Sequence, residues 1–370
     1  AHAHAHGAGH GGHFGEGLLA RLGGDEFVVL LEGLSGQEHE AAKQVELLAN
    51  KILAALRQPY LLRDKIYQGT PSIGIVVLTQ EPLGSDELLK RADVAMYQAK
   101  AAGRNTLRFF DPELQAVATA FIAFELDLRL GLERQEFELH YQVQFDLAGV
   151  VTGAEALLRW RRGGLDLVPP GQFIPIAEAN GLILPLGQWV LETACAQLVA
   201  WSQQPQRARW TMAVNVSALQ FAQSDFVESV GRALHLTGAK ASLLKLELTE
   251  SMLVNDIEDV VAKMKAIQAY GVAFSLDDFG TGYSSLSILH RLPLQQLKID
   301  QSFVRDILTD PNDAVIARTI VALAHNLDLR VIAEGVESAQ QRDFLAAIGC
   351  DAFQGYFFGR PEAEQNLPAL

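Results

Sequence analysis

Short apolar runs alternate with longer segments of helical period through most of this chain, and this alternation limits its fold more than any other feature. The runs are rich in Val, Ile, Leu and Phe, as buried strands are. Strands that alternate with helices favour a parallel sheet. The number of repeats predicts an α/β fold in which the sheet closes into a (β/α)8 TIM-type barrel. The chain is also long for one domain, at 370 residues, so we expect a domain boundary.

Polar side chains, mostly acidic, close or nearly close the apolar runs of the second part. They are Glu155, Asn215, Glu247, Asp277, Asp278 and Glu334. In a TIM-type barrel, polar residues at the carboxyl ends of the strands usually form the active site. Taken singly, each acid could as well cap a helix or pair with a surface cation. The series as a whole predicts one shared pocket.

Five acids in one pocket need compensating charge. Two carboxylates about 5 Å apart repel by about 3 kcal/mol at an effective dielectric constant of about 20. Such a cluster therefore shares protons or holds cations. Oxygen ligands suit Mg²⁺ or Mn²⁺, and the sequence has no Cys/His cluster for zinc. We predict a two-metal site, because two divalent ions nearly offset five negative charges and suit in-line attack on a phosphate ester.

An ordered set of motifs resembles the EAL family of cyclic di-GMP phosphodiesterases, from about residue 118 to 362. The motifs are EALLRW from Glu155, NVS from Asn215, ELTES from Glu247, DDFGTGYSSL from Asp277, LKID around Lys298, EGVE from Glu334 and QGY from Gln354. The resemblance implies hydrolysis of cyclic di-GMP to linear pGpG in bacterial signalling. It also implies dependence on Mg²⁺ or Mn²⁺, inhibition by Ca²⁺, and a homodimer.

The same resemblance assigns roles to individual residues. The implied metal ligands are Glu155, Asn215, Glu247, Asp277, Asp278 and Glu334. The implied catalytic residues are Glu155, Lys298, Glu334 and Glu250, with Lys298 orienting the attacking water. The implied substrate contacts are Gln142, Arg159, Asn215, Asp278 and Gln354.

Two of these assignments carry a further expectation. Glu250 resembles the acid that anchors the glycine-containing loop from Asp278 to Leu286; the alternative is that it caps a helix at 256–270. The family proline after Gln142 is replaced by Val143. We expect this replacement to affect substrate affinity more than chemistry.

Residues 18–110 resemble the C-terminal half of a GGDEF diguanylate cyclase domain. The motif lies in RLGGDEFVVLLEG, which predicts a hairpin with its turn at Gly23-Gly24, and ADVAMYQAKAAGRN follows from Ala92. Helices at 38–56 and 85–102 and strands at 72–78 and 105–110 complete a small α+β segment. The family's metal-binding strand should precede the motif and is missing, so we predict no cyclase activity.

The predicted organisation is a tag-like His-rich segment at 1–17, the partial GGDEF domain at 18–110, a linker at 111–117 and the EAL domain at 118–370. An amphipathic helix is expected from Glu113 to Leu132. The net charge of -14 opposes binding to nucleic-acid polymers. Two cysteines give no disulfide framework, no apolar run approaches the length of a membrane span, and no signal peptide is visible. We therefore expect a cytoplasmic chain without a membrane segment.

Two other functions fit the same pattern. One is a catalytically silent cyclic di-GMP receptor, which the complete ligand set argues against. The other is a barrel that acts on a different phosphodiester. Turnover of cyclic di-GMP against other cyclic nucleotides separates the three.

Overall fold

The computed structural model describes residues 17–62, 65–67, 69–78, 83–164, 166–253, 257–280 and 286–367. Almost all of the predicted His-rich segment therefore lies outside the described residues. The chain divides into two compact units between Asp127 and Leu128, inside helix α3 (Pro112–Glu133). The helix predicted from Glu113 is confirmed, while the linker at 111–117 stays a prediction.

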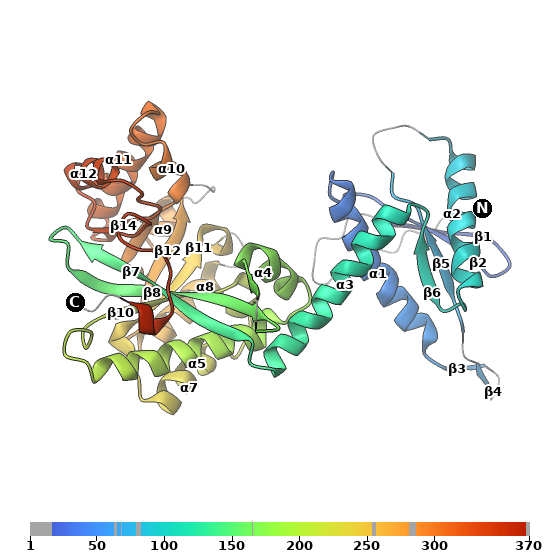
Figure 1. Cartoon of the computed structure of the whole chain (residues 1–370), viewed down its shortest axis with the longest axis horizontal. Helices are drawn as coiled ribbons and strands as arrows, with labels where there is room; N and C mark the ends of the chain where they lie inside the picture. Colours follow the sequence, from blue (N-terminus) through green and yellow to red (C-terminus); the bar gives the residue numbers. More distant parts are fainter. Residues whose placement is uncertain are drawn as a thin grey trace. The chain divides into compact units, whose positions relative to one another are not determined.

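The first unit is a small α+β structure (Figure 1). Strands β1 (Gly17–Gly23) and β2 (Glu26–Leu31) form the predicted antiparallel hairpin. Gly24 has a φ of +53° in its turn, a conformation that glycine adopts without strain. The remaining elements are α1 (Glu38–Arg57), β3 (Tyr60–Leu62), β4 (Lys65–Tyr67), β5 (Ser72–Ile75), α2 (Ser85–Ala101) and β6 (Thr106–Phe109). The β3–β4 hairpin was not predicted.

A parallel pair of strands, β5 and β6, carries the core of this unit. Leu53 of α1 packs with Ile75, Leu107 and Phe109 of these strands. Helix α2 lies close against β5, since a Cβ added at Gly74 would come within 2.2 Å of the Ala92 carbonyl oxygen. The helices predicted at 38–56 and 85–102 and the strands predicted at 72–78 and 105–110 are thus present as α1, α2, β5 and β6.

The second unit is an eight-stranded barrel. Its strands are β7 (Phe137–Asp146), β8 (Val151–Arg162), β10 (Thr211–Asn215), β11 (Leu244–Thr249), β12 (Ala273–Phe279), β13 (Gln296–Ile299), β14 (Arg330–Ala333) and β15 (Ala352–Phe353). The sheet closes because β8 pairs with both β7 and β10. The predicted barrel is confirmed.

The first strand departs from the predicted all-parallel arrangement. Strand β7 runs antiparallel to both of its neighbours, β8 and β15. The reason is local: only residues 147–150 separate β7 from β8. A link of that length joins antiparallel strands, whereas parallel strands need a crossover of a dozen or more residues.

Helices and short elements connect the strands of the barrel unit. They are β9 (Asp166–Val168), α4 (Pro170–Ala179), α5 (Ile183–Ser202), α6 (Ala218–Phe221), α7 (Phe226–Thr237), η1 (Ala241–Leu243), η2 (Glu250–Leu253), α8 (Ile257–Gln268), α9 (Leu286–Leu289), α10 (Gln301–Arg305), α11 (Pro311–Asn326), α12 (Ala339–Ala347) and η3 (Glu364–Asn366). Helix α5 contacts β7, β10 and α7.

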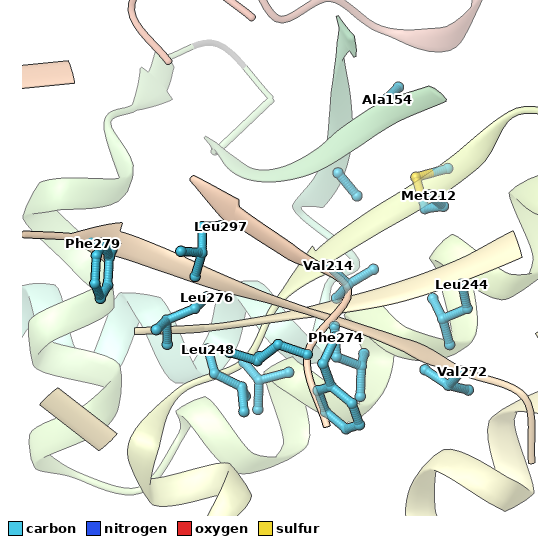
Figure 2. Packing of buried hydrophobic residues seen from close by; sticks show 14 of the residues in the cluster. Ala154, Met212, Val214, Leu244, Leu248, Val272, Phe274, Leu276, Phe279 and Leu297 are labelled. Atoms are coloured by element: carbon cyan, nitrogen blue, oxygen red, sulfur yellow. The ribbon is translucent and has the colours of Figure 1, made fainter. Parts of the chain in front are cut away.

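Apolar and polar residues alternate along the barrel strands. Val214, Leu248, Leu276 and Leu297 are buried in one continuous core cluster, shown in close-up in Figure 2. Their chain neighbours point to the opposite side of the sheet, because the side-chain period of a strand is two. The alternation therefore sends a set of polar side chains into the barrel interior.

Helix α5 is long and apolar enough to cross a membrane, judged by length and composition alone. The expectation that no apolar run reaches that length is therefore wrong. The helix belongs to the barrel core, where Leu191, Ala194, Leu198 and Trp201 are buried. Packing against the strands explains its apolar composition.

Candidate active site

Lys298 lies at the centre of an acidic cluster inside the barrel, and its side chain is 0% exposed. Its Nζ lies near oxygen atoms of four carboxylates from four other segments of the barrel. The distances are 2.6 Å to Glu334 Oε1, 2.7 Å to Glu247 Oε2, 3.2 Å to Asp277 Oδ2 and 3.5 Å to Glu155 Oε2. The structure thus brings four of the predicted acids together around one ammonium group.

The cluster shifts the acid–base behaviour of its members in different directions. Burial lowers the pKa of Lys298, but the surrounding carboxylates outweigh it and hold that pKa well above its usual range. Burial raises the pKa of Glu247 to about 8, assisted by Glu155 and Asp277 and opposed by Lys298. Burial also dominates at Glu334, whose pKa is raised well above its ordinary value. The raised pKa values mean that Glu247 and Glu334 favour a bound proton or a nearby cation.

The pKa of Glu155 is shifted in the opposite direction, below its ordinary value. Burial raises its pKa, yet Lys298 and the side-chain amides of Gln354 and Asn215 lower it further than burial raises it. Asn215 Nδ2 donates to Glu155 Oε1 at 2.5 Å, and Gln354 Nε2 donates to Glu155 Oε2 at 2.6 Å. Both carboxylate oxygens are therefore engaged.

The position of Glu155 differs from the prediction that each acid closes or nearly closes its strand. It lies in the first half of the 12-residue strand β8. The strand continues because its second half pairs with β7 and β9. Asn215, at the last position of β10, and Glu334, directly after β14, fit the prediction.

A β-bulge brings two adjacent aspartates to the site. The register between β12 and β13 shifts between Leu276 and Phe279, and Asp278 has a φ of +54°. Left-handed backbone is uncommon for residues other than glycine and is concentrated at functional sites. Burial, with Asp277 and Asp300, raises the pKa of Asp278 to about 6. The bulge explains how successive residues of a strand can serve one site.

Glu250 is buried and begins the 3-10 turn η2. Its Oε2 accepts a hydrogen bond of 3.2 Å from the backbone N–H of Gly280. Gly280 belongs to the predicted loop from Asp278 to Leu286, of which residues 281–285 lie outside the described part of the chain. Helix α8 begins at Ile257, seven residues after Glu250. The contact favours the loop-anchor role over the helix cap.

Three of the predicted substrate contacts, Gln142, Arg159 and Gln354, lie on β7, on β8 and directly after β15. Gln142 is opposite Glu155 in the ladder, and its Oε1 accepts a 3.0 Å hydrogen bond from Gln354 Nε2. Arg159 is partly buried, and burial lowers its pKa. Within the described residues, its guanidinium donates only to the carbonyl oxygen of Leu158. Most of its donors therefore have no protein acceptor there.

Sequence reasoning missed Gln144. This residue lies two positions after Gln142 on β7, and its Nε2 donates to Gln354 Oε1 at 2.9 Å. The signal was available, because residues two apart in a strand share a face. It was not used because Gln144 belongs to none of the recognised motifs.

The donor set suits hard divalent cations. Carboxylate and amide oxygens, with no sulfur or imidazole among them, are the ligands that Mg²⁺ and Mn²⁺ prefer. One of these oxygens, Glu247 Oε1, is buried and has no hydrogen-bond partner within the described residues. In the described ranges, no group of three or more His, Cys, Asp or Glu side chains is arranged so that it could hold a metal ion. Four of the acids instead lie within 3.5 Å of Lys298 Nζ.

Two family models match the chain. The EAL domain model covers residues 125–361, and the model of the diguanylate cyclase GGDEF domain covers residues 13–106. EAL-domain proteins generally depend on divalent metal ions.

Curated relatives match nearly the whole chain. The bifunctional diguanylate cyclase/cyclic di-GMP phosphodiesterase MucR of Pseudomonas aeruginosa is 43% identical over 95% of the chain and 51% of the relative. The cyclic di-GMP phosphodiesterase PdeR of Escherichia coli is 38% identical over 93% of the chain and 51% of the relative. The chain thus spans about half the length of such relatives.

Solved structures match the barrel. The PaMucR phosphodiesterase in complex with c-di-GMP is 45% identical, with a TM-score of 0.64, over 66% of this chain and 98% of that one. The EAL enzyme Bd1971, bound to cAMP and cyclic di-GMP, is 32% identical, with a TM-score of 0.65, over 75% and 73% of the two chains.

Proposed function

Because this chain belongs to the EAL domain family, we propose that it hydrolyses cyclic di-GMP to linear pGpG in bacterial second-messenger signalling. The observation that carries the proposal is the convergence of four of the five predicted acids around Lys298. The names of its relatives, MucR and PdeR, support the same substrate.

The residues divide into two groups of metal ligands. The first metal would be held by Glu155, Asn215, Glu247 and Asp277. The second would be held by Asp277, Asp278 and Glu334. Bound Mg²⁺ or Mn²⁺ supplies Lewis acidity at the phosphodiester. Ca²⁺ should inhibit, because it is larger and accepts looser coordination.

The chain's own side chains then orient the reactants. Lys298 Nζ donates hydrogen bonds to the attacking water. The Arg159 guanidinium, with donors left over, binds a phosphate oxygen of the substrate. Gln142 and Gln354 contact the substrate, and Glu250 holds the loop after Gly280. Burial of the cluster strengthens each of these electrostatic interactions.

The proposal assigns no cyclase activity to the first unit. Asp25 and Glu26 lie at the hairpin of β1 and β2, in the part of the chain that matches the GGDEF domain model.

Dimerisation and location are also part of the proposal. Leu308 and Val315 are 51% and 57% exposed, and both line a hollow with Pro311 and Phe344 beside α11. An apolar surface of this kind on barrel helices supports a homodimer. Cys195 and Cys350 are both free and buried, which supports a reducing, cytoplasmic compartment.

The experiment that tests the function sets turnover of cyclic di-GMP against other cyclic nucleotides in Mg²⁺, with binding of each measured in parallel. We expect the chain to form pGpG from cyclic di-GMP and to leave the other cyclic nucleotides unhydrolysed. Binding without hydrolysis would identify the silent receptor. Hydrolysis of another cyclic nucleotide in preference would indicate a different phosphodiester substrate.

A further inference from the structure

Three buried glutamines form one hydrogen-bonded network beside Glu155. Gln144, which is 2% exposed, donates from Nε2 to Gln354 Oε1 at 2.9 Å. Gln354 Nε2 donates to Gln142 Oε1 at 3.0 Å and to Glu155 Oε2 at 2.6 Å. Gln142 Nε2 donates to the carbonyl oxygen of Gly359 at 3.1 Å. The network joins β7, β8 and the segment after β15.

The direction of every bond in this network follows from one group. Glu155 Oε2 accepts a hydrogen bond of 2.6 Å from Gln354 Nε2. The NH₂ of Gln354 must therefore face Glu155, which turns the amide oxygen of Gln354 toward Gln144. Only a donor at position 144 satisfies that oxygen. A buried amide oxygen left without a donor costs about 1–3 kcal/mol.

The backbone of Gln354 is held by hydrogen bonds, so only its side-chain amide is free to change orientation. The Gln354 N–H donates to Ala333 O at 2.9 Å, and its carbonyl oxygen accepts from Val336 N at 3.1 Å. The next residue is packed closely, since a Cβ added at Gly355 would lie 2.2 Å from Val336 N. With the backbone held on both sides, the orientation of the amide depends on its side-chain partners.

The ladder explains why Gln144 reaches this position. Ala352 and Phe353 pair with Asp146 and Phe145 of β7, so the next pair in the antiparallel register is Gln354 with Gln144. The antiparallel direction of β7 is therefore what places Gln144 opposite Gln354.

We propose that Gln144 is a positioning residue: it fixes the amide of Gln354, and through it the carboxylate of Glu155. This inference rests on the proposed function in treating Glu155 as a metal ligand. Gln144 itself touches neither the acidic cluster around Lys298 nor, in this proposal, the substrate. Loss of a partner of this kind typically weakens metal affinity or activity by about 10- to 100-fold.

The test is a double-mutant cycle in which titration calorimetry measures the affinity of the substrate-free full chain for Mn²⁺. Gln144→Met keeps the size of the side chain and removes the donor. We expect it to weaken Mn²⁺ binding about 10-fold. Gln354→Met should weaken binding at least as much. Adding Gln144→Met to Gln354→Met should then change it less than twofold, because residues of one network are not additive.

A matched control is Gln296→Met. Gln296 is also a buried glutamine of the barrel, but its Oε1 accepts from Lys245 Nζ at 2.5 Å, and within the described residues it makes no hydrogen bond to Glu155. We expect its Mn²⁺ affinity to stay within twofold of the wild type. Equal losses in Gln144→Met and Gln296→Met would overturn the proposal, since general loosening of the barrel would then explain both. Additive losses in the cycle would overturn it as well.

A crystal structure of Gln144→Met provides a readout independent of metal and turnover. We expect the contact of 2.6 Å between Gln354 Nε2 and Glu155 Oε2 to be lost. An unchanged contact would overturn the proposal even if Mn²⁺ binding were weakened. If the chain hydrolysed no cyclic di-GMP but the contact was lost, the positioning role would stand and the proposed function would fail.

Discussion

Lys298 Nζ and Glu247 Oε2 lie 2.7 Å apart inside the barrel, and both side chains are 0% exposed. Three further carboxylates lie within 3.5 Å of the same nitrogen. Lys298 is thus a cation that these four acids share. Removing one member of a buried ionic cluster typically costs about 3–5 kcal/mol, because the other charges remain buried.

Replacement of Lys298 tests this role. In the presence of a chelator, Lys298→Met should lower the free energy of unfolding by about 3 kcal/mol. Mg²⁺ should recover much of the loss, because it binds only the folded state. Urea unfolding with and without Mg²⁺ measures both. Lys265→Met, at an exposed position of α8, is the control and should change little. If Lys298→Met unfolded in chelator at the same urea concentration as the wild type, the buried acids would not need Lys298 for stability.

Glu250 separates a loop anchor from a helix cap. Glu250→Ala removes the acceptor of the Gly280 N–H. We expect kcat and Mg²⁺ affinity to fall by about 10- to 100-fold although Glu250 is not a metal ligand. A cap would instead cost about 1 kcal/mol of stability and leave kcat unchanged. Measuring kcat against Mg²⁺ concentration alongside a thermal melt distinguishes these results. Glu258→Ala, which removes the exposed partner of Arg291, is the control.

Replacements of Arg159 and Glu155 should affect different kinetic parameters. Glu155→Ala should abolish hydrolysis by removing a metal ligand. Arg159→Ala should mainly raise KM by removing a phosphate contact. Arg161→Ala is a control on the same strand, since that guanidinium is paired with Glu138. Steady-state kinetics on the three variants is the measurement, and wild-type kinetics in both Glu155→Ala and Arg159→Ala would place the site elsewhere.

The site could be located from the sequence because acids recur where apolar runs end. The barrel topology is enough to bring these residues together. Asn215, at the end of β10, and Glu334, directly after β14, illustrate this. The direction of β7 was missed, because the pattern that predicts a strand does not give its orientation; the short link to β8 does. The bulge at Asp278 was also not predictable, since it follows from register between β12 and β13. Gln144 was missed because it belongs to none of the recognised motifs and its partner Gln354 is distant in sequence.

The first unit offers a prediction about pH. Burial raises the pKa of Glu46 on α1 from 4.5 to about 6. The folded state therefore binds the proton of Glu46 more tightly than the unfolded state does. As pH rises through about 4.5 to 6, loss of this proton lowers the free energy of unfolding, by about 2 kcal/mol once the loss is complete. Glu46→Gln stays neutral and should stabilise α1 by about that amount at pH 8, and not at pH 4. Hydrogen exchange of the α1 amides measures it, with the exposed Glu40→Gln as control. Equal protection in wild type and Glu46→Gln at pH 8 would mean that Glu46 carries no such penalty.

The metal dependence of pGpG formation from cyclic di-GMP tests the central claim most directly. The purified chain, stripped of metal, should form no pGpG until Mg²⁺ or Mn²⁺ is added, and Ca²⁺ added to the Mg²⁺ enzyme should suppress product formation. Glu155→Ala should remain inactive at every Mg²⁺ concentration. Full turnover in Ca²⁺ alone, or after exhaustive chelation, would contradict a two-metal phosphodiesterase built on the acids around Lys298.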